Sequence, residues 1–279
     1  MSSIPTRTPL VGVDFSSAPS RRKPIVLARG ERQGKVVRLQ GLETFDSLAA
    51  FGAWLALPGP WLGGFDLPFG LPRELVQALG WPSDWSALIE RYAALSRSEI
   101  RDLFAAFCAA RPAGGKFAHR ACDGPAGSSP SMKWVNPPVA FMLHAGVPLL
   151  LQAGVQLHGH QPPPRPEAAR IALEAYPGLL AREILGRRSY KSDEAAKQAS
   201  PERLIARKDL VDALEQGRSQ RLGLRLKLSH AQRDELVADG SGDRLDAALC
   251  LMQAAWALEA PRHGWPLDAD PLEGWIVSA

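Results

Sequence analysis

The chain has 279 residues, of which 46% are hydrophobic, so it can form a substantial globular core. Its net charge of +4 permits an anionic partner without demanding one. Three cysteines, Cys108, Cys122 and Cys250, lie far apart and outside any CxxC motif, which argues against a disulfide framework or a structural zinc site. No apolar run approaches about 18 residues and the first residues lack an apolar signal core, so we expect a cytoplasmic protein without a membrane span.

The chain begins with predicted strands and one helix. The strands are rich in Val and Ile, and glycines 30 and 34 separate the second from the third as in a hairpin. Thr44 is a candidate N-cap for the helix, which Pro58-Gly59-Pro60 ends. The strands are expected at 10–13, 24–28, 35–39 and 61–65, and the helix at about 45–57.

Residues 72–166 differ in composition from what precedes them. Glycines at 114 and 115 and the proline run at 162–164 predict a helical insertion with long loops, which we interpret as a lid or substrate-recognition element within a single domain over residues 1–279. The proline run is expected to be a stiff linker back to the core. The tryptophans are expected to be core residues rather than platforms for base stacking: Trp81, Trp85 and Trp134.

After the insertion, the pattern returns to strand and helix. A strand is predicted at 168–174, although its alanines also suit a helix. In the last helix, Leu245, Leu249, Met252 and Trp256 form one apolar stripe, which predicts that this helix packs on the sheet. The helices are expected at 177–186, 201–216, 229–237 and 242–259. Alternation of strands and helices predicts an α/β fold.

Acidic residues recur at the ends of these elements. Asp14, Asp66 and Glu174 each end a predicted strand, and Asp243 and Asp246 open the last helix. Each has a simpler explanation: an aspartate caps a turn, and a helix dipole favours carboxylates in its first turn by about 0.3 to 1 kcal/mol. The combination argues otherwise, because carboxylates brought together repel one another unless a cation intervenes. The sequence therefore predicts a carboxylate metal site.

Longer motifs around these acids resemble a known family. The segments Gly12-Val13-Asp14, Gly64-Phe65-Asp66-Leu67-Pro68-Phe69-Gly70, Glu174-Ala175-Tyr176-Pro177, Asp243-Arg244-Leu245-Asp246-Ala247 and Glu273-Gly274-Trp275-Ile276 are similar to those of the RNase H-like nucleases grouped as domain of unknown function 429. The resemblance spans nearly the whole chain. It implies an RNase H-like mixed sheet flanked by helices, with the insertion described above.

The resemblance also implies a mechanism. Two divalent ions would assist hydrolysis of a phosphodiester, with Asp14 bridging both ions and Asp66 or Glu174, together with Asp243 and Asp246, completing the site. Mg²⁺ or Mn²⁺ suits such an all-oxygen site better than zinc. The substrate expected is a nucleic acid, although DNA, RNA, a branched junction and a small phosphoester all remain open, as does the oligomeric state.

Several basic residues are candidates for phosphate contacts. Arg21–Lys23 follow the first acidic strand, and Arg187, Arg188 and Lys191 follow the Glu174 helix. In the resembling family a Tyr-Lys segment recurs at this point, which makes Lys191 the preferred catalytic cation. The segment 116–120, with Lys116, His119 and Arg120, either contacts substrate or only solubilises a glycine-rich loop. The pair His158-Gly159-His160 is interpreted as a solvated turn rather than a base.

Two other functions stay open. Actin-like ATPases and phosphotransferases share the superfamily fold, but the chain has no glycine-rich nucleotide loop, and measurable ATP binding would favour them. A noncatalytic nucleic-acid-binding module is the second alternative. Failure to bind Mn²⁺ would favour that module.

Overall fold

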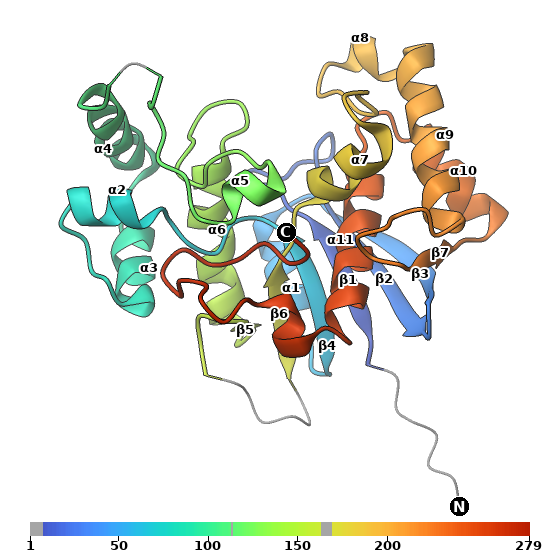
Figure 1. Ribbon diagram of the computed structural model, residues 1–279, viewed down its shortest axis with the longest axis horizontal. Coiled ribbons are helices and arrows are strands. Elements are labelled where there is room, and N and C mark those ends of the chain that lie inside the picture. The colour runs from blue at the N-terminus through green and yellow to red at the C-terminus, as the bar shows by residue number, and fades with distance from the viewer. Residues whose placement is uncertain (1–7, 113, 163–168) are drawn as a thin grey trace, which may run out of the picture.

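The computed structural model describes residues 8–112, 114–162 and 169–279. These residues form an α/β fold around a seven-stranded mixed sheet in the order β5-β6-β4-β1-β2-β3-β7 (Figure 1). Strands β1, β2 and β3 are antiparallel neighbours, whereas the pairs β1–β4, β4–β6, β5–β6 and β3–β7 are parallel. The strands are β1 (Leu10–Asp14), β2 (Ile25–Gln33), β3 (Val36–Phe45), β4 (Trp61–Asp66), β5 (Gln156–Leu157), β6 (Arg170–Glu174) and β7 (Arg225–Lys227).

Helices cover both faces of the sheet. Figure 1 shows α2 to α6 gathered in one lobe and α7 to α10 in another, with α11 lying against the sheet between them. The helices are α1 (Leu48–Leu55), α2 (Arg73–Ala78), α3 (Trp85–Ala93), α4 (Arg97–Ala109), α5 (Asp123–Ala126), α6 (Val139–Gln152), α7 (Pro177–Leu185), α8 (Ala195–Gln198), α9 (Pro201–Glu215), α10 (His230–Ala238), α11 (Asp243–Ala257) and a 3-10 helix η2 (Pro261–Gly264).

Alternation along the central strands divides the core into two layers. Val11 and Val13 of β1 pack into the cluster formed with α1, α3 and α6. Leu10 packs into the opposite cluster, which includes α9 and α11. Because side chains two residues apart share a face of a strand, Gly12 and Asp14 lie on the α11 side of the sheet with Leu10.

The first helix differs from its prediction. Strand β3 continues to Phe45, so α1 begins at Leu48, and Ser47 rather than Thr44 is its N-cap. The Ala50 backbone N–H donates to Ser47 Oγ at 3.2 Å. The β2–β3 hairpin is also tighter than expected, since Gln33 pairs with Val36 across two residues and Gly34 takes the positive φ of 57° that such a turn requires.

The predicted insertion is mostly helical, but it also contributes to the sheet. Its strand β5 pairs in parallel with β6, so the segment is not made of helices and loops alone. The predicted linker 162–164 lies outside the described residues except for its first proline. Trp81 and Trp85 are buried in the core and Trp134 packs against it, as the sequence predicts.

The last helix is buried on more than one side. As predicted, α11 packs on the sheet, against β1, β2 and β4, but α7 and α10 also cover its other side. Its buried residues run almost without interruption from Leu245 to Ala255, including the polar Asp246 and Gln253. Helices α7, α9 and α10 lie where the sequence predicts them. Among the described residues, no helix combines the length and apolar character needed to cross a bilayer.

A candidate carboxylate site at the ends of β1 and β4

Two aspartates lie side by side at one edge of the sheet. Asp14 ends β1 and Asp66 ends β4, and the two residues are register partners in this parallel pair. Neighbouring strands lie about 4.8 Å apart, so the two backbones deliver both carboxylates to the same place. Neither carboxylate accepts a hydrogen bond from any residue that the structure describes, and both are only partly buried. They therefore remain available to water or to a cation.

Glycines bring α11 against these strands. A Cβ at Gly12 would lie 2.1 Å from the Ala247 carbonyl oxygen, and one at Gly64 would lie 2.4 Å from the Cys250 carbonyl oxygen. Each glycine precedes its aspartate by two residues, so the contact and the carboxylate share one face of the strand. The Gly-x-Asp motifs therefore allow the close approach that carries Asp243 and Asp246 to Asp14 and Asp66.

Asp246 is the innermost acid of the cluster. Its side chain is fully buried, and its two oxygens are bound by consecutive residues of the segment after α7. The Tyr190 hydroxyl donates to Oδ1 and the Lys191 ammonium donates to Oδ2. Lys191, which the sequence suggests as the catalytic cation, thus lies at the cluster, while Tyr190 was not predicted as a site residue.

Three aspartates of the cluster have a raised pKa. Burial, followed by the charges of Asp246, Asp243 and Asp66, raises the pKa of Asp14 well above its usual range. Burial and Asp246 raise the pKa of Asp66 to about 7, against an opposing effect of Lys191. Burial, Asp239 and Asp246 raise the pKa of Asp243. One ammonium group does not balance the negative charge of this set of carboxylates, and a further cation would relieve their repulsion.

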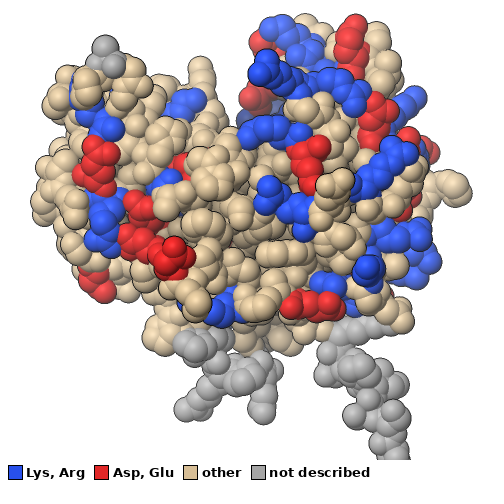
Figure 2. All heavy atoms as spheres, in the orientation of Figure 1, with Lys and Arg blue, Asp and Glu red and all other residues tan. Residues whose placement is uncertain are grey.

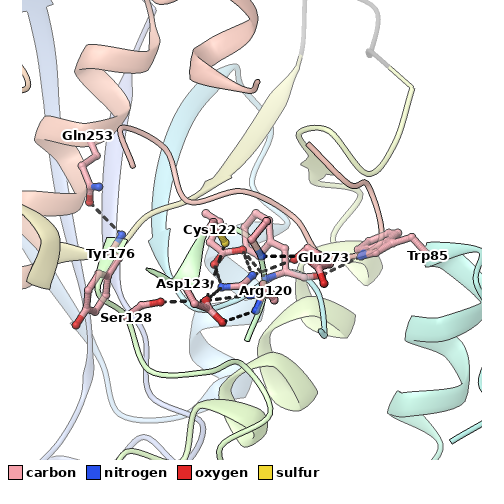
Figure 3. A network of polar contacts seen from close by, with 11 residues as sticks. Trp85, Arg120, Cys122, Asp123, Ser128, Tyr176, Gln253 and Glu273 are labelled. Atoms are coloured by element: carbon pink, nitrogen blue, oxygen red, sulfur yellow. Dashed lines mark hydrogen bonds and ion pairs between the residues drawn. The ribbon is translucent and has the colours of Figure 1, made fainter. Parts of the chain in front are cut away.

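Glu174 lies next to this cluster but is engaged elsewhere. It ends β6, opposite Phe65, and its carboxylate accepts two hydrogen bonds from the buried Arg120 guanidinium, at 2.6 and 2.8 Å. Arg120 also donates to Asp123 at 3.0 Å and to the Glu273 carbonyl oxygen at 3.0 Å (Figure 3). Burial raises the pKa of Glu174, and Arg120 opposes that rise. The structure thus gives Glu174 a buried ion pair, apart from the four aspartates.

Arg120 was misjudged from sequence. It is neither a substrate contact nor a solubilising residue, because it is buried and its guanidinium is occupied by protein oxygens. The same network holds the turn after Asp66: Phe69 N–H donates to Glu174 at 3.0 Å, and Trp85 Nε1 donates to the Phe69 carbonyl oxygen at 2.8 Å. The Gly-Phe-Asp-Leu-Pro-Phe-Gly motif therefore fixes the turn that follows Asp66.

The histidine pair was also misjudged. His160 does not lie in a solvated turn: its ring contacts Trp85 and Trp265, its Nδ1 lies 2.6 Å from the Pro271 carbonyl oxygen, and its buried Nε2 has no partner among the described residues. Burial lowers the pKa of His160 to about 3. His158 packs against His263 and Trp265. The pair thus joins the C-terminal segment to the insertion.

Basic residues gather beside the carboxylates. Figure 2 shows the molecule hollowed between its two lobes, with Lys and Arg concentrated on the lobe of α7 to α10. Arg187, Arg188 and Lys197 are exposed in the segment from α7 to α8. Lys23, in the loop after β1, forms an ion pair with Asp193 at 2.6 Å, so the two predicted basic segments lie together.

The donor chemistry suits a hard divalent cation. The four aspartates offer only oxygen ligands and carry more negative charge than Lys191 compensates, which is the environment that Mg²⁺ and Mn²⁺ prefer. Among the described ranges, however, no three His, Cys, Asp or Glu side chains are grouped so that they could hold a metal ion as they stand. The Lys191 ammonium binds one carboxylate oxygen of Asp246.

Comparison of the chain with models of protein families, with curated proteins and with solved structures found no match in any of the three. The family resemblance therefore rests on the sequence motifs.

Proposed function

We propose that the chain is a divalent-metal-dependent nuclease of RNase H-like fold that hydrolyses phosphodiester bonds in nucleic acid. The observation that carries this proposal is the register pairing of Asp14 with Asp66, directly beneath the α11 turn that carries Asp243 and Asp246. Four carboxylates from three elements lie at this edge of the sheet, and their mutual repulsion costs stability unless a cation offsets it.

The arrangement of the sheet supports the fold part of the proposal. An acid-ending strand, an antiparallel hairpin, a helix and a second acid-ending strand follow in that order, and the two acid-ending strands are parallel neighbours at the centre of the sheet. A late helix beginning Asp-x-x-Asp packs across them. This is the order of elements that the motifs imply for an RNase H-like domain.

In the proposed reaction, Asp14, Asp66, Asp243 and Asp246 hold the metal and orient it at the edge of the sheet. A divalent ion bound there supplies positive charge to the phosphate and lowers the pKa of a bound water. Arg187, exposed in the segment after α7, is our candidate for contact with the phosphates of the nucleic acid, whereas Arg188 pairs with Asp209. We leave Glu174 out of the ligand set, because Arg120 holds both of its oxygens.

The test is cleavage of a labelled panel of single-stranded, duplex, hybrid and branched nucleic acids with Mg²⁺ or Mn²⁺. We expect hydrolysis of at least one substrate, and a loss of at least about 100-fold in Asp14→Asn, because the variant removes a carboxylate that the charged site needs. Asp102→Asn is the matched control, since Asp102 is an exposed carboxylate of α4. Cleavage undiminished in Asp14→Asn, or no cleavage with either metal, contradicts the proposal.

A further inference from the structure

The carboxylate of Asp246 is already paired with a cationic side chain of the protein. Its buried carboxylate receives the Lys191 ammonium on one oxygen and the Tyr190 hydroxyl on the other. Both donors come from one short segment between α7 and α8, so one local movement would free both oxygens. No other carboxylate of the cluster has an ammonium group as a bonded partner among the residues described.

Lys191 is held across the start of α11. A Cβ added at Gly242, the N-cap of α11, would lie 2.6 Å from Lys191 Cβ and 3.0 Å from its Cδ, and Gly242 has a φ of 81°. The alkyl chain of Lys191 therefore passes over the first turn of α11, which bears Asp243 and Asp246. Absence of a side chain at position 242 makes this path possible.

The ammonium group is nevertheless free to leave. Although Asp246 is fully buried, the Lys191 side chain is 43% exposed. Four flexible methylene groups carry its charge, and the ammonium is strongly hydrated when it reaches water. The backbone of the segment is anchored separately, because the Lys191 carbonyl oxygen accepts from Ser189 Oγ at 2.9 Å and Arg203 Nε at 3.2 Å. Release of the side chain thus requires no unfolding of the segment.

We propose that Lys191 is a resident counter-ion of the aspartate cluster, which a divalent cation must displace from Asp246, so that Lys191 sets the metal affinity of the site. This inference rests on the proposed metal-binding function. The ammonium and a divalent ion compete for the same carboxylate oxygen, since either one relieves the repulsion among the four aspartates. When displaced, the Lys191 ammonium would be free to bind a phosphate of the substrate.

Calorimetric titration with Mn²⁺ tests the inference on the full chain. Lys191→Met keeps the alkyl chain and removes the charge, so we expect it to bind Mn²⁺ at least about tenfold more tightly than the wild type. Lys197→Met is the matched control, because Lys197 lies in α8, just after that segment, and pairs with the exposed Glu194. We expect its affinity to equal that of the wild type. Unchanged or weaker binding in Lys191→Met overturns the inference, as does absence of binding in both proteins.

A second measurement separates an effect on metal binding from a folding defect of the variant. Thermal unfolding of Lys191→Met and Lys191→Gln with and without Mn²⁺ should show a larger metal-induced increase in Tm than the wild type shows. An equal increase in all three proteins overturns the inference. Tighter Mn²⁺ binding without any metal-dependent cleavage would leave the role of Lys191 in place and contradict the nuclease proposal alone.

Discussion

Asp66 is the residue whose surroundings are most readily tested by titration. Its pKa rises from 3.8 in the unfolded chain to about 7 in the folded protein, through burial and the charge of Asp246. Between these pH values the folded protein holds a proton that the unfolded chain has released. Without metal, stability is therefore lost as the pH rises from about 4 to about 7, and below about 4 the effect disappears.

His160 has the opposite effect. Burial lowers its pKa from 6.5 to about 3, so the unfolded chain binds the extra proton and stability rises over that interval. Comparison of variants separates the effect of Asp66 on stability from that of His160. We expect the Tm of metal-free Asp66→Asn to fall less between pH 4 and pH 7 than that of the wild type, while Asp102→Asn follows the wild type. Parallel curves for all three proteins would show that Asp66 holds no such proton.

At the scale of elements, the site depends on how closely α11 lies on β1. Gly12→Ala places a methyl group 2.1 Å from the backbone of Ala247 and Leu251, and neither atom is a side chain that can turn away. We expect a loss of at least about 2 kcal/mol in urea unfolding. Gly41→Ala is the control in the same sheet, because nothing lies within 4 Å of its added Cβ. Its stability should stay within about 0.5 kcal/mol of the wild type.

A loss in Gly41→Ala as large as that in Gly12→Ala would contradict this account, because it would make the effect a general one of strand glycines. If the β1–α11 contact aligns the aspartates, we expect Gly12→Ala to bind Mn²⁺ more weakly than the wild type under conditions where the variant remains folded. Gly41→Ala should bind as the wild type does.

The elements that build the site could be predicted from sequence because their signals are local. Short apolar runs ending in Asp14 and Asp66 mark β1 and β4, and the start of α11 is predicted correctly. The sequence did not predict that α11 is buried on several sides. Its alanines are small apolar residues on the other faces of the helix, and the prediction rested on the stripe of larger residues alone. Strand β3 displaced the start of α1 because pairing with β2 outweighs the capping preference of Thr44.

The partners of individual side chains could not be predicted from sequence, because they come from segments far apart in the chain. Arg120 meets Glu174 across 54 positions and Lys191 meets Asp246 across 55. No spacing in the sequence distinguishes Glu174, which is bound by a guanidinium, from Asp66, which has no hydrogen-bond donor among the described residues. The sequence motifs therefore indicate which residues matter but not which of them share one site.

At the scale of the whole molecule, a buried network joins the insertion to the sheet and to the C-terminal segment. Arg120 comes from the segment before α5, Glu174 from β6 and Glu273 from the C-terminal segment, whose backbone carbonyl accepts from Arg120 (Figure 3). Arg182 of α7 adds a second link, donating to the carbonyl oxygen of Gly127 at 2.9 Å. These contacts fix the insertion relative to the sheet edge that carries the aspartates.

Removal of one partner of this buried network should lower the stability of the protein. Arg120→Met leaves Glu174 and Asp123 buried without their counter-charge, and we expect a loss of about 3–5 kcal/mol in the free energy of unfolding. Arg101→Met, in an exposed ion pair, should change it by less than about 0.5 kcal/mol. The double variant Arg120→Met/Glu174→Gln should recover part of the loss, and a fully additive loss would refute the coupling.

Binding of Mn²⁺ to the intact protein tests the account most directly. Calorimetry of the wild type, Asp14→Asn, Asp246→Asn and Asp102→Asn should show binding that both site variants weaken at least about tenfold and that the exposed-site variant leaves unchanged. Equal affinity in all four proteins, or no binding by the wild type, would contradict a metal site at the ends of β1 and β4.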